Sequence, residues 1–143
     1  GIGAVLPEAL RDAGAMGVLL NHAEKPLTIG AIEETITRAD EVGLFTLVCA
    51  DTPSQALAFA QLRPNILLVE PPALIGQAGV DVTERDYVRS VNVAVKAVDP
   101  RIQVLHGAGI KTGHFVRDTV SLGAAATGWS CGISGAEDPF ASI

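Results

Sequence analysis

A histidine and a glutamate each stand where an apolar stretch of this chain gives way to a loop. His22 follows the apolar run at residues 16–20, and Glu70 closes the apolar run at residues 65–70. In parallel α/β proteins the active site lies at the carboxyl ends of the strands, which is where both side chains fall. A carboxylate there can remove a proton next to a carbonyl group while an imidazole polarises the carbonyl oxygen. The pair predicts a proton-transfer enzyme. Taken singly, each residue could instead be an ordinary side chain at the start of a loop.

Three further segments could bind and enclose a small anionic substrate. Residues 107–113 form a glycine-rich turn, and residues 130–132 form a second turn after the next expected strand. Glycine lets backbone N–H groups approach phosphate oxygens, and barrels often bind phosphate between their last loops. The loop at residues 71–83 begins with two prolines and continues with Gly76 and Gly79, which is typical of a lid with a rigid hinge. Because strand-to-helix turns need glycine anyway, each turn alone is an unspecific signal.

The remaining histidines and cysteines show no metal-binding pattern. Cys49 and Cys131 form no Cys-x-x-Cys motif, and neither His106 nor His114 belongs to a recognisable ligand set. We expect Cys49 to pack in the core and the two histidines to be polar loop groups. The chain is therefore predicted to use no metal and no cofactor.

Composition argues against several classes of function. The net charge is -6 at pH 7, whereas general nucleic-acid binders carry a basic stripe. No apolar run approaches the length of a membrane span and no signal peptide is visible, so no membrane partner is expected. A reduced, cytoplasmic protein is the default for such a sequence. With 48% hydrophobic residues and few aromatics, the core must be mainly aliphatic, which suits buried parallel strands.

Apolar strands and helices alternate along the chain, which predicts an α/β protein of parallel βα units in a single domain over residues 1–143. A five-stranded doubly wound sheet and part of a (β/α)8 barrel both fit this alternation. The expected strands are residues 16–20, 44–49, 65–70, 102–105 and 124–129, and the expected helices are residues 6–14, 28–42, 53–62, about 84–98 and 115–122, with another beginning near 137.

Taken in order, three motifs resemble triosephosphate isomerase of the short, archaeal type. They are Leu-Leu-Asn-His-Ala-Glu at residues 19–24, Val-Glu-Pro-Pro-Ala-Leu-Ile-Gly at residues 69–76 and Gly-Ala-Gly-Ile-Lys-Thr-Gly at residues 107–113. The resemblance covers essentially the whole chain, which corresponds to about the last two-thirds of the family. It implies a (β/α)8 TIM barrel of which this chain forms a partial barrel, strands four to eight, without the first three βα units.

The resemblance also implies a role for each candidate residue. His22 would be the electrophile, Glu70 the base that moves a proton through an enediol or enediolate, and Glu24 the carboxylate that partners the family's catalytic lysine. The reaction would interconvert glyceraldehyde 3-phosphate and dihydroxyacetone phosphate, in glycolysis and gluconeogenesis, in a dimeric or tetrameric homo-oligomer. The residues that would contact this small phosphorylated sugar, partly through backbone amides, are Ile75, Gly76, Gly109, Ser130 and Cys131.

Departures from the family's pattern leave two alternatives open. Ala23, Ala73 and His106 replace the usual Ser, Glu and Cys, and Ser-Cys at residues 130–131 replaces Ala-Ser. These changes leave room for an isomerase of another small sugar phosphate, such as a tetrulose phosphate. The other alternative is a non-catalytic anion-binding fragment, because the family's Asn-x-Lys strand is absent and its lysine stabilises the enediolate charge. We expect this segment alone to be inactive, and sequence upstream of Gly1 to encode that strand.

Overall fold

A single parallel sheet organises the part of the chain that the computed structural model describes, residues 4–71, 85–110, 112–128 and 131–140. Its order is β1-β2-β3-β4-β5, so each strand pairs with its neighbours in the sequence. A doubly wound sheet reverses its strand order at a switch point, whereas an unbroken order is that of a barrel. The strands are β1 Gly17–Leu20, β2 Phe45–Ala50, β3 Ile66–Val69, β4 Gln103–His106 and β5 Ala126–Thr127.

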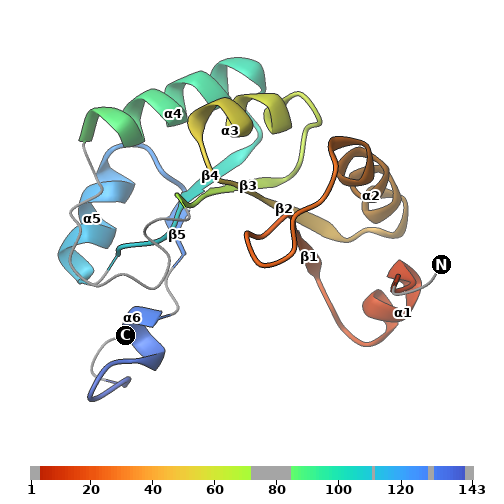
Figure 1. The fold of residues 1–143 in the computed structure, drawn as a ribbon, viewed down its shortest axis with the longest axis horizontal. Coiled ribbons are helices and arrows are strands. Elements are labelled where there is room, and N and C mark those ends of the chain that lie inside the picture. The colour runs from red at the N-terminus through yellow and green to blue at the C-terminus, as the bar shows by residue number, and fades with distance from the viewer. Residues whose placement is uncertain (1–3, 72–84, 111, 129–130, 141–143) are drawn as a thin grey trace.

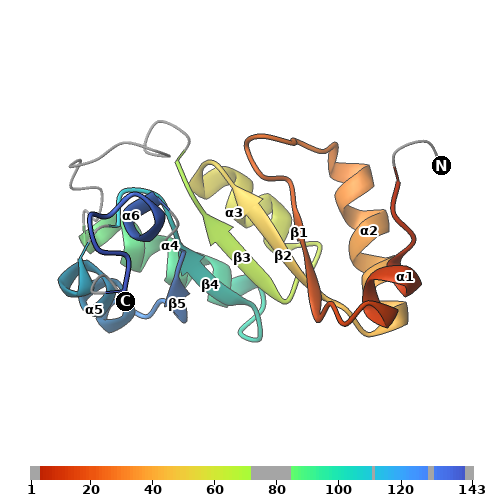
Figure 2. The same ribbon diagram turned by 90° about the horizontal axis from the view of Figure 1, so that it is seen from below.

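The longer helices form an outer layer around one face of this sheet. In Figure 1 they follow one another around it from α2 to α5, and Figure 2 shows the strands side by side from a second direction. The helices are α1 Pro7–Asp12, α2 Ile29–Val42, α3 Pro53–Ala60, α4 Arg85–Val98, α5 Gly113–Ser121 and α6 Cys131–Ser134. The strand order and this layer confirm the predicted partial TIM barrel and exclude the doubly wound sheet.

The hydrophobic core lies between the sheet and the helices. Val48, Leu67 and Val104 are fully buried on the helix-facing side of three adjacent strands and belong to one cluster with side chains of α2, α3 and α4. Because side chains alternate along a strand, the intervening residues face the opposite, concave side. There Leu19 and Phe45 are each 55% exposed. The helix side is therefore packed, and the concave side is open at β1 and β2.

Three of the helices have a threonine as their N-cap residue. The hydroxyl oxygens of Thr28, Thr52 and Thr112 each accept a hydrogen bond from the backbone N–H three residues later, which satisfies a donor that the first helical turn leaves unpaired. At the other end of α2, Gly43 has φ 76°, the left-handed conformation that glycine adopts at little cost. These local signals explain why α2 and α3 begin where they were expected.

Most element bounds differ from the sequence expectations by one or two residues, and one expected helix is absent from the described residues. Helix α5 begins at Gly113 instead of residue 115, because Thr112 caps it. A helix beginning near residue 137 was also expected, and that prediction is wrong: α6 ends at Ser134 and residues 137–140 form bends and turns. There the backbone N–H of Phe140 donates to Asp138 Oδ1 at 3.0 Å, a side-chain bond of the kind that competes with helix formation.

Truncating Leu67 should show how much the core contributes to stability. Leu67 is 0% exposed, so Leu67→Ala should lower the free energy of unfolding by about 2–5 kcal/mol through lost apolar contact and a residual cavity. Leu57→Ala on α3 is the control, because the Leu57 side chain is already 38% exposed and should cost less. Urea unfolding of the complete natural polypeptide measures both. Equal losses would contradict the placement of the core.

Candidate active site

The structure brings His22 and Glu70 together at the carboxyl edge of the sheet. His22 comes after β1 and Glu70 comes directly after β3, and β2 lies between these two strands in the sheet. His22 Nε2 lies 3.8 Å from Glu70 Oε2. The exposed fractions of the side chains are 27% and 15%. The pair is thus close enough to act on one small molecule and is partly shielded from water. The sequence placed both residues at strand ends, but did not show that they approach each other across β2.

Asn21 explains how His22 reaches across the end of β2. It has φ 57°, a left-handed conformation that asparagine tolerates better than most residues. Its side-chain nitrogen donates to the Cys49 carbonyl at 3.0 Å, and its side-chain oxygen accepts the Leu27 N–H at 2.8 Å. The first bond ties the loop after β1 to β2, the second closes that loop on itself, and the turn at Asn21 redirects His22. Sequence reasoning missed this role, although asparagine directly after a strand is a recognisable signal for such a turn.

A backbone contact selects the tautomer of His22. The Glu24 N–H donates to His22 Nδ1 at 3.3 Å, so Nδ1 is the acceptor nitrogen of the neutral ring. The proton then resides on Nε2, the nitrogen that faces Glu70. The Glu24 carboxylate lies 3.6 Å from Nδ1 but is 89% exposed. His22 therefore presents the N–H of Nε2 to the space beside Glu70.

The Glu70 carboxylate occupies a space that only glycine leaves open. A Cβ atom added to Gly107, directly after β4, would lie 2.1 Å from Glu70 Oε1. One added to Gly128, directly after β5, would be in ordinary contact with Oε1 at 3.8 Å and would first meet Leu68 Cδ1 at 3.2 Å. Burial raises the pKa of Glu70; His22 partly offsets this, and Asp51 adds to it. Glu70 is therefore a stronger base than an exposed glutamate. The need for glycine at position 107 was not visible in the sequence, where the turn itself accounts for glycine.

Cys49, near the end of β2 and close to the Glu70 carboxylate, is a buried residue of the core, as expected. It is 2% exposed, and its pKa is raised to about 12 by burial first and by the Glu70 and Asp51 carboxylates second. The thiol is thus protonated at neutral pH and is a poor nucleophile.

Among the described residues no group of three or more His, Cys, Asp or Glu could hold a metal ion. No helix among these residues is long and apolar enough to cross a membrane.

The remaining predicted site residues are only partly covered by the structure. Gly109 has φ 72° in the turn after β4, and Cys131 is the first residue of α6. Ile75, Gly76 and Ser130 lie outside the described residues. Their predicted contacts with a substrate, and the predicted lid, stay predictions, as does the pairing of Glu24 with a lysine.

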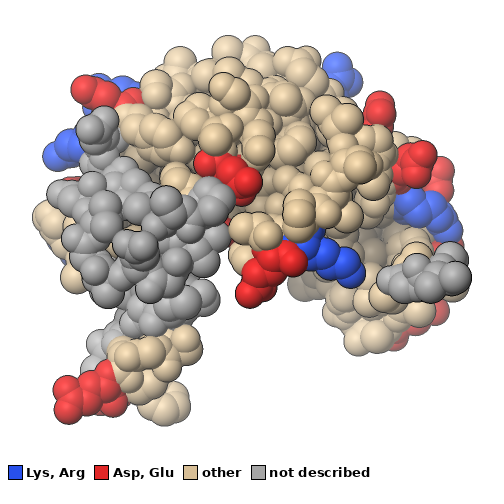
Figure 3. Space-filling view, viewed as in Figure 1, with Lys and Arg blue, Asp and Glu red and all other residues tan. Residues whose placement is uncertain are grey.

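Acidic side chains lie near the middle of one face of the molecule, with a basic side chain beside the lower group (Figure 3). The chain carries a net charge of -6. A bound anion would therefore depend on backbone N–H groups, such as those of the glycine-rich turn after β4, more than on a basic patch.

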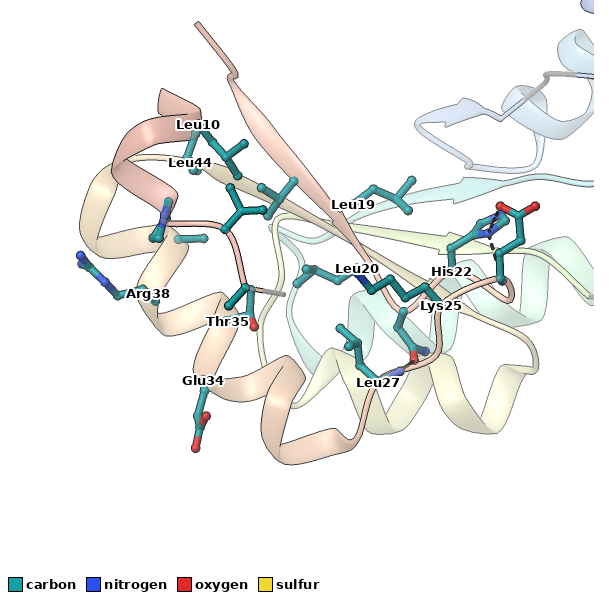
Figure 4. Close-up of a pocket in the computed structure, with 17 residues that line it drawn as sticks. Leu10, Leu19, Leu20, His22, Lys25, Leu27, Glu34, Thr35, Arg38 and Leu44 are labelled. Carbon is teal, nitrogen blue, oxygen red and sulfur yellow. Dashed lines mark hydrogen bonds and ion pairs between the residues drawn. The ribbon is translucent and has the colours of Figure 1, made fainter. Parts of the chain in front are cut away.

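His22 also lines a cavity of about 840 Å³ along the outer edge of β1. Its walls come from α1, α2 and β1, and Figure 4 shows Leu10 and Leu44 at one end and His22 at the other. Most of the lining is apolar, and in the described sheet β1 pairs with β2 alone. The cavity thus follows an open edge of the described sheet.

The fold and site together define a class: an α/β-barrel segment with a histidine and a glutamate close together at the carboxyl ends of its strands. The family model of triosephosphate isomerase matches residues 2–125. The chain therefore belongs to the triosephosphate isomerase family.

Individual relatives support this membership. Triosephosphate isomerase of Methanoculleus marisnigri is 43% identical over 144 residues, which cover 99% of this chain and 64% of that protein. The protein of the same name from Halobacterium salinarum is 45% identical over 112 residues, which cover 78% of this chain and 52% of that protein. The chain thus spans less than two-thirds of the length of these relatives.

Solved structures with low sequence identity share the fold. The native KDPGal structure matches with a TM-score of 0.61 at 15% identity, covering 91% of this chain and 55% of that chain. A mandelate oxidase mutant with an FMN adduct matches with a TM-score of 0.61 at 18% identity, covering 85% and 42%. At such identities the likeness shows the fold alone.

Proposed function

We propose that the protein is an isomerase that interconverts glyceraldehyde 3-phosphate and dihydroxyacetone phosphate. The observation that carries this proposal is the His22–Glu70 pair, 3.8 Å apart at the carboxyl edge of the sheet in a chain of the triosephosphate isomerase family. One group of the pair is a carboxylate with a raised pKa, and the other presents an N–H donor beside it. Isomerising a hydroxy-carbonyl compound requires these two groups.

In the proposed mechanism Glu70 moves the proton and His22 stabilises the oxygens. The Glu70 carboxylate removes a proton from C1 of dihydroxyacetone phosphate, the C–H electron pair forms the C1–C2 double bond, and the carbonyl electron pair moves to the C2 oxygen. His22 Nε2–H gives its proton to that oxygen and regains one from the C1 hydroxyl. Protonated Glu70 returns its proton to C2, which yields glyceraldehyde 3-phosphate. This division of roles is the one established for triosephosphate isomerases.

Substrate phosphate is proposed to bind through backbone amides near Gly109, Ser130 and Cys131, with Ile75 and Gly76 on a closing lid. The net charge of -6 and the glycine-rich turn, where Gly109 has φ 72°, support this choice. The enediolate also needs a cation, and we propose that a complete barrel supplies the lysine that Glu24 would partner. The open edge of β1 and the greater length of the relatives support a complete barrel. An oligomer of identical chains is part of the same proposal.

The proposed substrate is tested by a kinetic comparison on the complete natural polypeptide. We expect kcat/KM for glyceraldehyde 3-phosphate to exceed that for a tetrulose phosphate. A preference for the tetrulose phosphate would replace the substrate but keep the chemistry. Phosphate binding without turnover of either sugar would favour the non-catalytic alternative and overturn the proposal.

Gly107→Ala should disable the base without removing it. The added methyl group would fall 2.1 Å from Glu70 Oε1, so the carboxylate must move. A displacement of about 1 Å at a reacting group can cost about 100-fold in rate, and we expect a loss of that order in kcat. Gly30→Ala on α2 is the matched control, because a Cβ there meets nothing within 4 Å. Steady-state kinetics of both variants decides, and wild-type kcat in Gly107→Ala would refute the packing argument.

A further inference from the structure

His106, which the sequence suggested to be a polar loop group, is a buried strand residue, so that expectation is wrong. It is the last residue of β4 and is 3% exposed. Its side chain shares the helix-facing side of the strand with Val104, and its ring meets Tyr87 of α4 edge-on, with ring centroids 6.3 Å apart. Nothing in the proposed mechanism uses this histidine.

A short chain of hydrogen bonds fixes the imidazole. Asn92 of α4, 4% exposed, donates its side-chain N–H to the Leu122 carbonyl at 3.2 Å, directly after α5. A carbonyl only accepts, so the Asn92 side-chain oxygen is left to face His106 Nε2 at 2.9 Å, and Nε2 must donate. Burial lowers the pKa of His106 to about 4, which keeps the ring neutral at physiological pH. The side chain thus joins β4 to α4 and to the end of α5.

Backbone hydrogen bonds connect His106 and the next residue to segments beside Glu70. Its carbonyl accepts the Gly128 N–H at 2.9 Å, and the next residue, Gly107, donates its N–H to the Val69 carbonyl at 3.0 Å. Gly107 is the residue against which the Glu70 carboxylate packs, and Gly128 is the other glycine beside that carboxylate. A change at His106 would therefore be passed on to the backbone of Gly107, the glycine whose missing side chain leaves space for Glu70.

We propose that His106 is a positioning residue: its hydrogen bond to Asn92 holds the backbone at Gly107 and so fixes the Glu70 carboxylate. The kinetic part of this inference rests on the proposed function, in which Glu70 is the base. Asn92 is the second residue of this arrangement, because its side chain connects the imidazole to the Leu122 carbonyl. The effect acts through Glu70, since the imidazole lies on the helix side of the sheet and does not face the substrate.

The test compares His106→Phe with His106→Gln in the complete natural polypeptide. Phenylalanine keeps a ring but loses the donor, whereas glutamine keeps an N–H for Asn92. We expect His106→Phe to lower kcat about 10- to 100-fold with little change in KM, and His106→Gln to retain most of it. The pKa of Glu70, followed by 13C NMR of its labelled carboxyl carbon, should fall in His106→Phe as the carboxylate becomes more hydrated. Val95→Ala, a fully buried α4 residue, controls for lost stability and should change neither readout.

The outcomes separate this inference from the proposed function. If His106→Phe leaves the Glu70 titration unchanged, or if His106→Phe, His106→Gln and Val95→Ala behave alike, His106 is a core residue only and the inference is overturned. If the wild-type protein lacks isomerase activity but the Glu70 titration still shifts in His106→Phe and not in His106→Gln, the positioning role stands and the proposed function fails.

Discussion

Replacing Glu70 with glutamine is expected to lower kcat by about 10²- to 10⁴-fold, the contribution typical of a positioned general base. Glutamine has the same size but cannot accept the substrate proton, so KM should change little. Glu33→Gln is the matched control, because Glu33 is an exposed residue of α2 away from the site. Steady-state kinetics with the triose phosphates measures both variants. An isomerase rate near that of the wild type in Glu70→Gln would contradict the assignment of the base.

The same variant should be more stable than the wild type at neutral pH. The pKa of Glu70 is raised in the folded protein, chiefly by burial, so its carboxyl group favours folding below its unfolded pKa. This stabilising contribution of Glu70 is lost as the pH rises through its pKa in the folded protein, because the ionised carboxylate must then be held in a poorly hydrated site. Glutamine removes this cost, so urea unfolding should show Glu70→Gln gaining stability over the wild type from acidic to neutral pH. The opposite pH trend would contradict the raised pKa.

Replacing His22 with leucine is expected to lower kcat by about 10²- to 10³-fold, as for the loss of a hydrogen-bond donor to a developing oxyanion. Leucine cannot supply the N–H that Nε2 presents beside Glu70. His114→Leu is the control, because His114 lies on α5 with a side chain that is 76% exposed. Unchanged turnover in His22→Leu would show that the oxygens are stabilised elsewhere.

A pH profile adds a second readout for His22→Leu. The interaction with His22 lowers the pKa of Glu70 and so opposes the effect of burial. Without His22, that pKa should rise, and the acidic limb of the kcat/KM profile should move to higher pH. A shift to lower pH would mean that the two groups do not interact as the geometry indicates.

Local patterns in the sequence locate the strands and most helices of this protein. The apolar run before Glu70 predicts a buried strand, and β3 spans Ile66–Val69. Helical spacing and a closing glycine predict α2, which ends at Val42 with Gly43 as its C-cap, as expected. Periodicity cannot order the strands, because a barrel and a doubly wound sheet repeat the same βα unit. The unbroken strand order settles that choice.

The site was predictable as separate residues but not as an arrangement. Strand ends identify His22 and Glu70, whereas their 3.8 Å separation depends on the left-handed turn at Asn21. Gly107 looks like any turn glycine until the position of the Glu70 carboxylate is known. The role of His106 was missed because it depends on a distant partner. A signal for that partner exists, since Asn92 is a polar residue on the buried, valine-lined face of α4.

Isomerisation in D2O tests the central claim, proton transfer by Glu70, most directly. Conversion of glyceraldehyde 3-phosphate by the complete natural polypeptide is followed by 1H NMR, with Glu70→Gln in parallel. Proton transfer through a solvent-exchanging carboxyl group predicts dihydroxyacetone phosphate with deuterium at C1 from the wild type, and both turnover and labelling almost abolished in Glu70→Gln. Unlabelled product would indicate a hydride shift between the carbons, and undiminished labelling in Glu70→Gln would indicate another base; either result would contradict the account.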